Sequence, residues 1–232
     1  MIRLMYIDVT PLNDENTFDF FYKNVSKYRQ EKINTFRQVK DKNLSLGAGI
    51  LLGSALKDLG LCEKDMLYKE GKYGKPYFEN EPNLYFSVSH SHNMALVALC
   101  DTEIGCDIER IDKIDLSIAK RFFHTDEYNN IIGLHNTSEQ QRQFFRFWTL
   151  KESFIKATGF GFKLPLNEFC INLSGEKISV SCSDTDGIYN FAEYSDIPDF
   201  CVAYCIKGKA EKTKLECKNN LLLTAFYDNI IL

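Results

Sequence analysis

The stretch that decides the fold is Trp148-Thr149-Leu150-Lys151-Glu152-Ser153-Phe154-Ile155-Lys156. It places one acid and two bases inside an aromatic-rich run with helical spacing, which core packing alone does not require. Glu152 and Lys156 are four residues apart and therefore share one face of a helix. Leu150 and Phe154 lie on another stripe, suited to a core. The pattern predicts a helix over residues 138–158, and its Glu–Lys pair fits either a functional site or an ordinary surface ion pair.

About forty residues upstream, the run Ile104-Gly105-Cys106-Asp107-Ile108-Glu109 predicts a strand. Alternate residues of a strand share a face, so Asp107 and Glu109 are expected on the outward face, about 7 Å apart. We expect Gly105 to leave open space beside Asp107 for a large ligand. Paired carboxylates suit Mg²⁺, which commonly combines them with substrate phosphates. Two solvated acids on an exposed strand would give the same pattern, so both interpretations stay open.

Two further motifs carry polar groups suited to phosphate. The strand end Phe86-Ser87-Val88-Ser89-His90-Ser91 offers hydroxyls and an imidazole. His90 and His92 could instead be metal ligands, or the segment could be a plain hairpin. Gly74-Lys75-Pro76 is a rigid turn that presents a lysine. Residues 23–42 form a local basic stretch, which most simply is a solvated helix face.

The composition limits the class of protein. The 232 residues carry a formal net charge of −4, which argues against a nucleic-acid partner. The eight cysteines include no C-x-x-C pair, and they are most simply small buried hydrophobes in a reducing compartment. No apolar run approaches ~18 residues, so no membrane span is expected. We expect a cytoplasmic protein.

The order of the expected elements predicts an α+β protein. A strand at 1–9 precedes helices at 14–36 and 39–59 and strands at 84–89 and 94–100. The second part repeats this order, with the strand at 104–109, helical segments at 115–132 and 138–158, and strands at 169–173, 178–182, 189–194 and 200–206. We expect an N-terminal half over residues 1–102, a C-terminal half over 103–206, and an extension over 207–232 that begins as a mobile polar connection.

Five motifs in this order resemble the 4′-phosphopantetheinyl transferases of the surfactin-synthetase-activating type. They are Gly74-Lys75-Pro76, Phe86–Ser91, Ile104–Glu109, the Phe122-Phe123 to Glu127-Tyr128 segment, and Trp148–Lys156. The resemblance runs to about residue 206. Cys106 stands where the family usually has Val or Ile, and Ser87 replaces the common Asn.

The resemblance implies two similar α+β halves in a pseudo-twofold arrangement, with the active site between them. It implies transfer of 4′-phosphopantetheine from coenzyme A to a serine of an apo acyl or peptidyl carrier protein, with release of 3′,5′-ADP. The carrier would serve fatty-acid, polyketide or nonribosomal peptide synthesis. We expect a monomer, and Lys120, Arg121 and Phe122 as part of the carrier-docking surface, although Phe122 fits a core position equally well.

The resemblance also implies roles for individual residues. Asp107, Glu109 and Glu152 would bind Mg²⁺, and Glu152 would also act as the base toward the serine. Lys156, assisted by Lys151, would stabilise charge on the pyrophosphate. The remaining expected contacts to phosphates and nucleotide are Lys75, Ser89 and His90, with Arg29, Lys32 and Ser45 near the 3′-phosphate. The alternatives are a non-catalytic module that binds coenzyme A or a carrier protein, and another Mg²⁺-dependent phosphotransferase or pyrophosphatase acting on a free nucleotide, although the chain lacks the G-x-x-x-x-G-K-[ST] loop.

Overall fold

The computed structural model describes residues 2–208 and 213–224 and divides into two compact units. The first unit contains the chain up to Lys69, Pro76–Asp101 and the chain from Thr213 onward. The second contains Glu70–Lys75 and Thr102–Lys212. The units therefore depart in two places from a simple division near residue 102. The short turn Glu70–Lys75 belongs with the second unit, and the C-terminal strand belongs with the first. Within the described ranges, no helix is long and apolar enough to cross a membrane.

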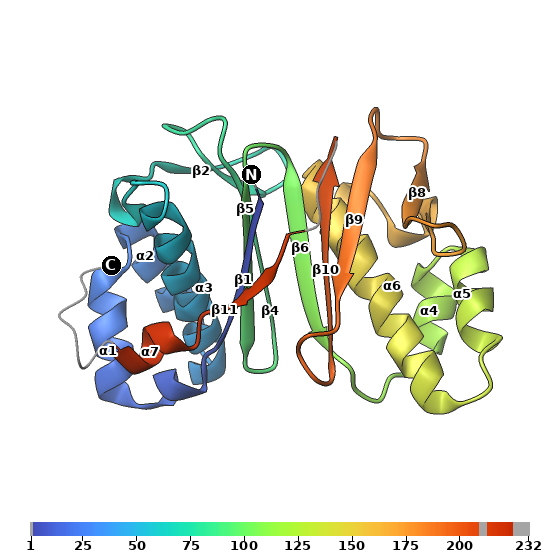
Figure 1. Cartoon of the computed structure of the whole chain (residues 1–232), viewed down its shortest axis with the longest axis horizontal. Coiled ribbons are helices and arrows are strands. Elements are labelled where there is room, and N and C mark those ends of the chain that lie inside the picture. The colour runs from blue at the N-terminus through green and yellow to red at the C-terminus, as the bar shows by residue number, and fades with distance from the viewer. Residues whose placement is uncertain (1, 209–212, 225–232) are drawn as a thin grey trace. The chain divides into compact units, whose positions relative to one another are not determined.

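The first unit has a four-stranded sheet in the order β11-β1-β5-β4 (Figure 1). Its strands are β1 (Ile2–Asp8), β4 (Tyr85–Ser91), β5 (Met94–Cys100) and β11 (Leu215–Cys217). Strands β4 and β5 form a hairpin that turns at His92, which has a left-handed φ of 58°. Strand β11 pairs in parallel with β1, and Leu215 is buried. The connection expected to begin at residue 207 therefore contains a strand at Leu215–Cys217, where Leu215 packs into the core of the first unit. The part of that connection at residues 209–212 lies outside the described residues.

The helices of the first unit are α1 (Glu15–Asn24), α2 (Lys27–Thr35), α3 (Val39–Lys57) and α7 (Asn220–Thr224), with short 3-10 turns at Thr10–Asn13 and Glu63–Asp65. The single helix expected over 14–36 is two helices. Ser26 caps α2 by accepting a hydrogen bond from the Arg29 backbone N–H. The buried Glu63 carboxylate in turn accepts from the backbone N–H and the hydroxyl of Ser26 at 2.6 and 2.7 Å. This distant partner fixes the break.

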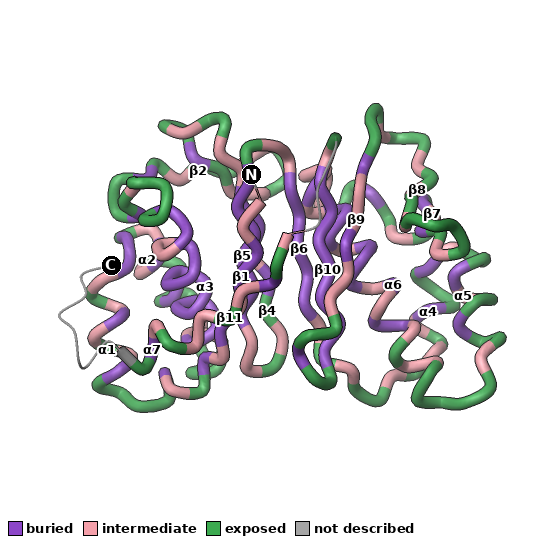
Figure 2. Tube along the Cα trace, viewed as in Figure 1, coloured by how far each residue is buried: buried purple, intermediate pink, exposed green. Residues whose placement is uncertain are grey.

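Helix α3 is buried along most of its length and packs against β5 and β1 (Figure 2). Gly47 is required there, because a Cβ would overlap the Val9 side chain. Gly49 allows the Arg29 side chain of α2 to cross α3, since the Arg29 Cγ would lie 2.8 Å from a Cβ at that position. The core of this unit therefore depends on close helix–helix and helix–sheet approach.

The second unit has a three-stranded antiparallel sheet in the order β6-β10-β9. Its strands are β6 (Ile104–Arg110), β9 (Tyr189–Tyr194) and β10 (Phe200–Lys207), and a separate hairpin is formed by β7 (Phe169–Asn172) and β8 (Ser179–Cys182). Its helices are α4 (Ser117–Phe122), α5 (Thr125–Ile132) and α6 (Thr137–Thr158), with 3-10 turns at Gly161–Lys163 and Leu166–Glu168. Short strands β2 (Tyr68–Glu70) and β3 (Pro76–Phe78) flank the turn Gly71–Lys75.

The two units share one order of elements. In each, a first strand is followed by two shorter helices and a long helix, and then by a hairpin whose second strand pairs antiparallel with the first strand. These are β1, α3 and β4-β5 in one unit, and β6, α6 and β9-β10 in the other. The expected α+β class and its repeated order are confirmed.

Helix α6 lies directly on the face of β6 that carries Gly105. A Cβ on Gly105 would overlap the Ser153 carbonyl oxygen and the Ala157 backbone nitrogen, and would lie 2.8 Å from the Lys156 Cβ. The expectation that Gly105 leaves space for a ligand is therefore wrong, because the space is filled by the helix backbone. The glycine instead brings α6 against the strand that carries Asp107.

Candidate active site

The charged groups of the second unit come from β6 and α6. Asn136 caps the start of α6 by accepting a hydrogen bond from the Glu139 backbone N–H, and Gly159 ends it in a left-handed conformation with φ of 72°. Arg146 ties the same helix to β9 through two hydrogen bonds to the Glu193 carboxylate, at 2.9 and 2.7 Å. These contacts fix the rotation of α6, so the face with Glu152 and Lys156 is turned toward Asp107.

Lys156 and Asp107 form the central contact of this group. The Lys156 ammonium donates to Asp107 Oδ1 at 2.7 Å and to the Cys106 carbonyl oxygen at 3.2 Å. Asp107 is only 3% exposed, whereas Lys156 is half-buried. A buried carboxylate needs such a partner, because an unpaired charge away from water is strongly unfavourable.

Glu152 shares this environment. Burial raises the pKa of Glu152, the negative charge of Asp107 raises it further, and the ammonium of Lys156 opposes both effects. Burial disfavours the charged form of Lys156, but attraction to Asp107, Cys106 and Glu152 outweighs it and raises the pKa of Lys156. Two acids and one base thus influence each other within one partly buried site.

Glu109 lies two residues beyond Asp107 on the same face of β6, and it is half-buried. Its partner in the neighbouring strand is Cys201, and Ala203 is the partner of Asp107. Both β10 residues are small, which leaves the two carboxylates unobstructed by large side chains on that side. The predicted set of Asp107, Glu152 and Lys156 is brought together by the structure, with Glu109 adjacent to it along the strand.

Lys151 does not belong to this group, which corrects its expected contact with phosphates. Its side chain is fully buried and its ammonium lies 2.7 Å from Glu127 Oε1. It also donates to the Phe169 carbonyl oxygen at 2.8 Å and lies 4.0 Å from the centre of the Phe169 ring. Lys151 therefore has no surface to offer a ligand. Sequence reasoning gave Glu127 no role, although the Phe122-Phe123 to Glu127-Tyr128 motif marked its position.

Lys75 is also engaged by the protein. Its ammonium donates to the carbonyl oxygens of Ile104 at 3.0 Å and Ala157 at 3.3 Å. Burial lowers the pKa of Lys75 from its ordinary value of 10.5 to about 8, although Glu103, Cys106 and Cys205 oppose the effect. The side chain expected to hold phosphate is directed into its own unit.

The other expected ligand contacts lie in the first unit. Ser89 is buried and His90 exposed on β4, and Lys32 is exposed on α2. Arg29 and Ser45 are both buried, and the Arg29 Nε and Ser45 Oγ atoms have no hydrogen-bond partner among the described residues. Buried polar atoms are nearly always satisfied, so each of these two atoms requires a partner that the described residues do not supply.

Comparison with known proteins places this arrangement in a family. The 4′-phosphopantetheinyl transferase superfamily matches residues 103–205, which contain β6, α6 and their acids. The chain is 36% identical over 175 residues to the 4′-phosphopantetheinyl transferase gsp of Aneurinibacillus migulanus, covering 74% of this chain and 72% of that protein. It is 33% identical to the ffp transferase of Bacillus subtilis and 32% identical to the Sfp transferase of Bacillus subtilis strain 168, each over 87% of this chain and 89% of the relative.

The chain belongs to the 4′-phosphopantetheinyl transferase superfamily. The resemblance identified from five motifs is thereby confirmed. The enzyme class that follows is a transferase. Within this transferase, the charged group on β6 and α6 combines carboxylates with a lysine, which are the kinds of side chain that phosphate chemistry uses.

A second set of ligand-type side chains lies elsewhere in the second unit. Ligand atoms of His124, Asp126 and Cys170 lie within 4.8 Å of one another beside a cavity of about 480 Å³. His124 Nδ1 already accepts a hydrogen bond from the Asp126 backbone N–H as the cap of α5. The N-terminus of a helix carries partial positive charge, which disfavours a cation. This set is better explained as a helix cap.

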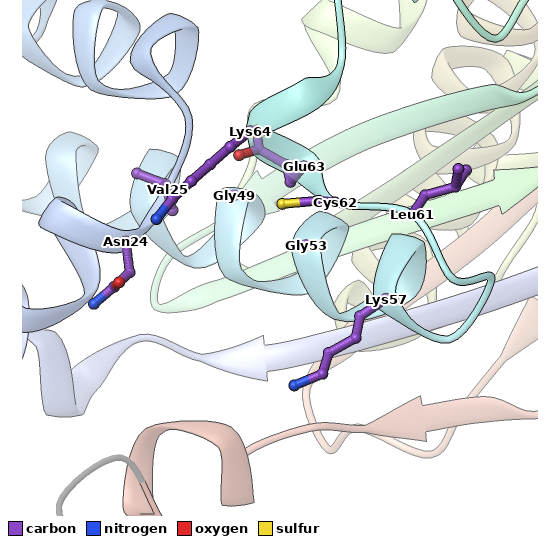
Figure 3. A pocket seen from close by; sticks show the side chains of 9 residues that line it. All are labelled: Asn24, Val25, Gly49, Gly53, Lys57, Leu61, Cys62, Glu63 and Lys64. Atoms are coloured by element: carbon purple, nitrogen blue, oxygen red, sulfur yellow. The ribbon is translucent and has the colours of Figure 1, made fainter. Parts of the chain in front are cut away.

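The first unit contains a smaller cavity of about 200 Å³ over the glycines of α3 (Figure 3). Its lining residues are Asn24, Val25, Gly49, Gly53, Lys57, Leu61, Cys62, Glu63 and Lys64. The Glu63 carboxylate is already used by Ser26 and by the Tyr68 hydroxyl. The walls of the cavity are therefore mainly apolar, and Gly49 and Gly53 contribute no side chains to them. The acid cluster of the candidate site does not line this cavity.

Proposed function

We propose that this transferase moves the 4′-phosphopantetheine group of coenzyme A to a serine of an apo acyl or peptidyl carrier protein. A bond forms between the serine oxygen and the β-phosphorus of coenzyme A, the bond from that phosphorus to the bridging oxygen breaks, and 3′,5′-ADP leaves. The serine proton passes to the enzyme. The proposal rests on the membership of the family together with the ion pair of Asp107 with Lys156 and the electrostatic influence of both on Glu152.

The donor set fits Mg²⁺. Asp107 is buried and influences Glu152, so two carboxylates repel each other in a site with limited access to water. A divalent cation would relieve this repulsion, and an all-oxygen set suits a hard ion better than a soft one. We propose Asp107, Glu109 and Glu152 as the residues that hold it. When bound, Mg²⁺ neutralises phosphate charge and polarises the phosphoryl oxygens.

Lys156 and Glu152 have different proposed roles in the transfer. Phosphoryl transfer requires mainly positioning and charge stabilisation. Lys156 is held beside Asp107 and supplies positive charge where negative charge accumulates on the pyrophosphate. Glu152 is half-buried beside Asp107 and accepts the serine proton, directly or through water.

In the first unit, we propose that Arg29 and Ser45 bind the 3′-phosphate of coenzyme A. Their support is the pair of buried atoms, Arg29 Nε and Ser45 Oγ, that lack a partner among the described residues. Exposed Lys32 adds positive charge on the same helix as Arg29, and Ser89 and His90 supply further donors at the end of β4.

The deciding experiment measures the intact mass of an apo carrier protein incubated with the transferase, coenzyme A and Mg²⁺. The carrier should gain one phosphopantetheine group, and EDTA should prevent the gain. Asp107→Asn and Glu152→Gln should each remove most turnover, because each takes away a charged oxygen of the proposed metal site. Glu139→Gln, on the first turn of the same helix, is the matched control and should retain activity.

Three outcomes separate the alternatives. No gain of mass on fatty-acid and peptide-synthase carriers, with coenzyme A still bound, would favour a non-catalytic binding module. Release of 3′,5′-ADP without any carrier would indicate a different phosphotransferase. Near wild-type turnover of Asp107→Asn or Glu152→Gln would contradict the proposed metal site. Size-exclusion chromatography of the same preparation tests the proposed monomer.

A further inference from the structure

Lys75 connects the two elements that carry the charged groups of the candidate site. One of its hydrogen bonds reaches the Ile104 carbonyl oxygen at the start of β6, and the other reaches the Ala157 carbonyl oxygen in the last turn of α6. Ile104 lies three residues before Asp107, and Ala157 directly follows Lys156. A single ammonium thus joins the backbones on either side of the Lys156–Asp107 contact.

The end of α6 needs such a donor. The last carbonyl groups of a helix have no partner within the helix, and a positive charge near them is favourable. Gly159 ends α6 in a left-handed conformation, and the Lys75 Cδ would lie 3.5 Å from a Cβ on Gly159. The aliphatic part of Lys75 therefore covers the helix end while its ammonium binds the carbonyl groups.

The backbone that presents Lys75 is itself fixed. Gly71 donates its N–H to the Lys75 carbonyl oxygen at 2.9 Å, and Gly74 donates to the Gly71 carbonyl oxygen at 3.0 Å. Gly74 has a positive φ of 85°, and Pro76 follows Lys75 directly. The turn that closes at Lys75 is therefore tight and directs its side chain toward the second unit, of which Glu70–Lys75 is a part.

We propose that Lys75 is a positioning residue that holds the C-terminal end of α6 against the start of β6 and thereby sets the alignment of Lys156 and Glu152 with Asp107. This role rests on the proposed function for its effect on transfer, but its structural part does not. This role differs from a direct contact with phosphate, because the carbonyl oxygens of Ile104 and Ala157 compete with a phosphate for the Lys75 ammonium. It also complements Gly105, which permits the close approach that Lys75 then secures.

Lys75→Met tests the role, because methionine keeps much of the apolar length and removes the donor. We expect kcat to fall by about 10²-fold, the loss typical of an ångström-scale misplacement, while the dissociation constant for coenzyme A stays close to that of the wild type. We also expect a higher Mg²⁺ concentration for half-maximal activity. Faster amide hydrogen exchange should be confined to the last turn of α6 and the start of β6.

Lys72→Met is the matched control, since Lys72 is exposed in the same turn and only approaches the Tyr73 ring. It should change neither the exchange pattern nor kcat. Lys75→Gln provides a second variant that loses the charge but can still donate to a carbonyl group. It should lie between Lys75→Met and the wild type in both measurements, and it replaces Lys75→Met if that variant does not fold.

The results distinguish the possible roles of Lys75. Weaker binding of coenzyme A, with kcat at saturation and hydrogen exchange unchanged, would overturn the proposal in favour of a direct phosphate contact. Unchanged behaviour of Lys75→Met in every measurement would also overturn it. If wild-type protein transfers nothing to any carrier, the proposed function fails. Amide hydrogen exchange in Lys75→Met still reports whether the ammonium holds the end of α6 against the start of β6.

Discussion

The ammonium of Lys151 lies 2.7 Å from the carboxylate of Glu127, and both side chains are fully buried. Glu127 also accepts hydrogen bonds from the backbone N–H groups of Ile171 at 2.7 Å and His124 at 3.0 Å. The pair therefore joins α5, α6 and β7 through one set of charge-assisted bonds. Lys151 is adjacent to Glu152 on α6, so the same contacts that stabilise this unit also fix the helix that presents the candidate base.

Removing one member of this pair should strongly destabilise the protein. Glu127→Gln or Lys151→Met leaves the other charge buried without its partner, and we expect a loss of about 3–5 kcal/mol in the free energy of unfolding. Urea denaturation measures the loss. The double variant Glu127→Gln/Lys151→Met should lose less than the sum of the single changes, because no unpaired charge remains. Additive losses would contradict a direct interaction.

Gly105 should not tolerate a side chain. Gly105→Ala places a methyl group into the backbone of α6 at Ser153 and Ala157, so the helix must move away from β6. We expect a loss of stability of about 1–3 kcal/mol or more and a clear drop in transfer, because Lys156 moves with the helix. Thermal unfolding and carrier modification measure the two effects. Gly53→Ala is a control, since its Cβ would lie an ordinary 3.7 Å from the Glu63 side chain.

Much of this fold was predictable because its longest elements have clear periodicity. The helix predicted over 138–158 is α6, and the strand predicted over 104–109 is β6, each matching within one residue at either end. The break between α1 and α2 was not predictable from local patterns, because Ser26 is secured by Glu63, which lies 37 residues away. Local periodicity contains no information on such a distant partner.

The candidate site was predictable to a similar extent. The grouping of Asp107 with Glu152 and Lys156 was predictable from the resemblance of their motifs to the family, since strand and helix periods determine only which residues of one element share a face. The surroundings of Lys151 and Gly105 did not follow from spacing. A lysine and a glutamate are compatible with either an exposed or a buried ion pair. The space beside a glycine can hold either a ligand or the backbone of a helix. Only packing distinguishes these cases.

Glu63 should stabilise the first unit through its three hydrogen bonds. Its carboxylate accepts from the Ser26 N–H, the Ser26 hydroxyl and the Tyr68 hydroxyl. Burial, together with the negative charge of Glu63, raises the pKa of Tyr68 well above its ordinary value. Glu63→Ala leaves buried donors unsatisfied, and we expect a loss of about 1–3 kcal/mol. The control Glu79→Ala, at an exposed ion pair with Lys69, should change the unfolding free energy far less.

Glu63→Ala should also weaken the binding of coenzyme A if Arg29 holds its 3′-phosphate. Ser26 caps α2, and Arg29 follows three residues later on that helix. Loss of the Glu63 contacts therefore loosens the turn that carries Arg29. Isothermal titration with coenzyme A and with 3′-dephospho-coenzyme A separates the effects, since Glu63→Ala should weaken only the first. Equal weakening of both ligands would contradict the role of Arg29.

The contribution of Lys75 to the free energy of unfolding should depend on pH, and the burial of the ammonium sets the direction of this dependence. Burial lowers its pKa to about 8 in the folded protein, against 10.5 as its ordinary value, while the nearby Glu103, Cys106 and Cys205 oppose the shift. Between these two values the unfolded chain binds the additional proton, so the free energy of unfolding rises with pH. Below about pH 8 both states are protonated, and the cost of burying the charge is fully present.

Comparison of wild type with Lys75→Met isolates this effect, because all other titrating groups are common to both proteins. The wild type should gain stability relative to the variant as the pH rises from about 8 toward 10.5, by at most about 3 kcal/mol. Urea denaturation at a series of pH values measures the difference. A constant difference, or one that shrinks as the pH rises, would show that the ammonium is not buried at the end of α6 as its contacts with Ile104 and Ala157 require.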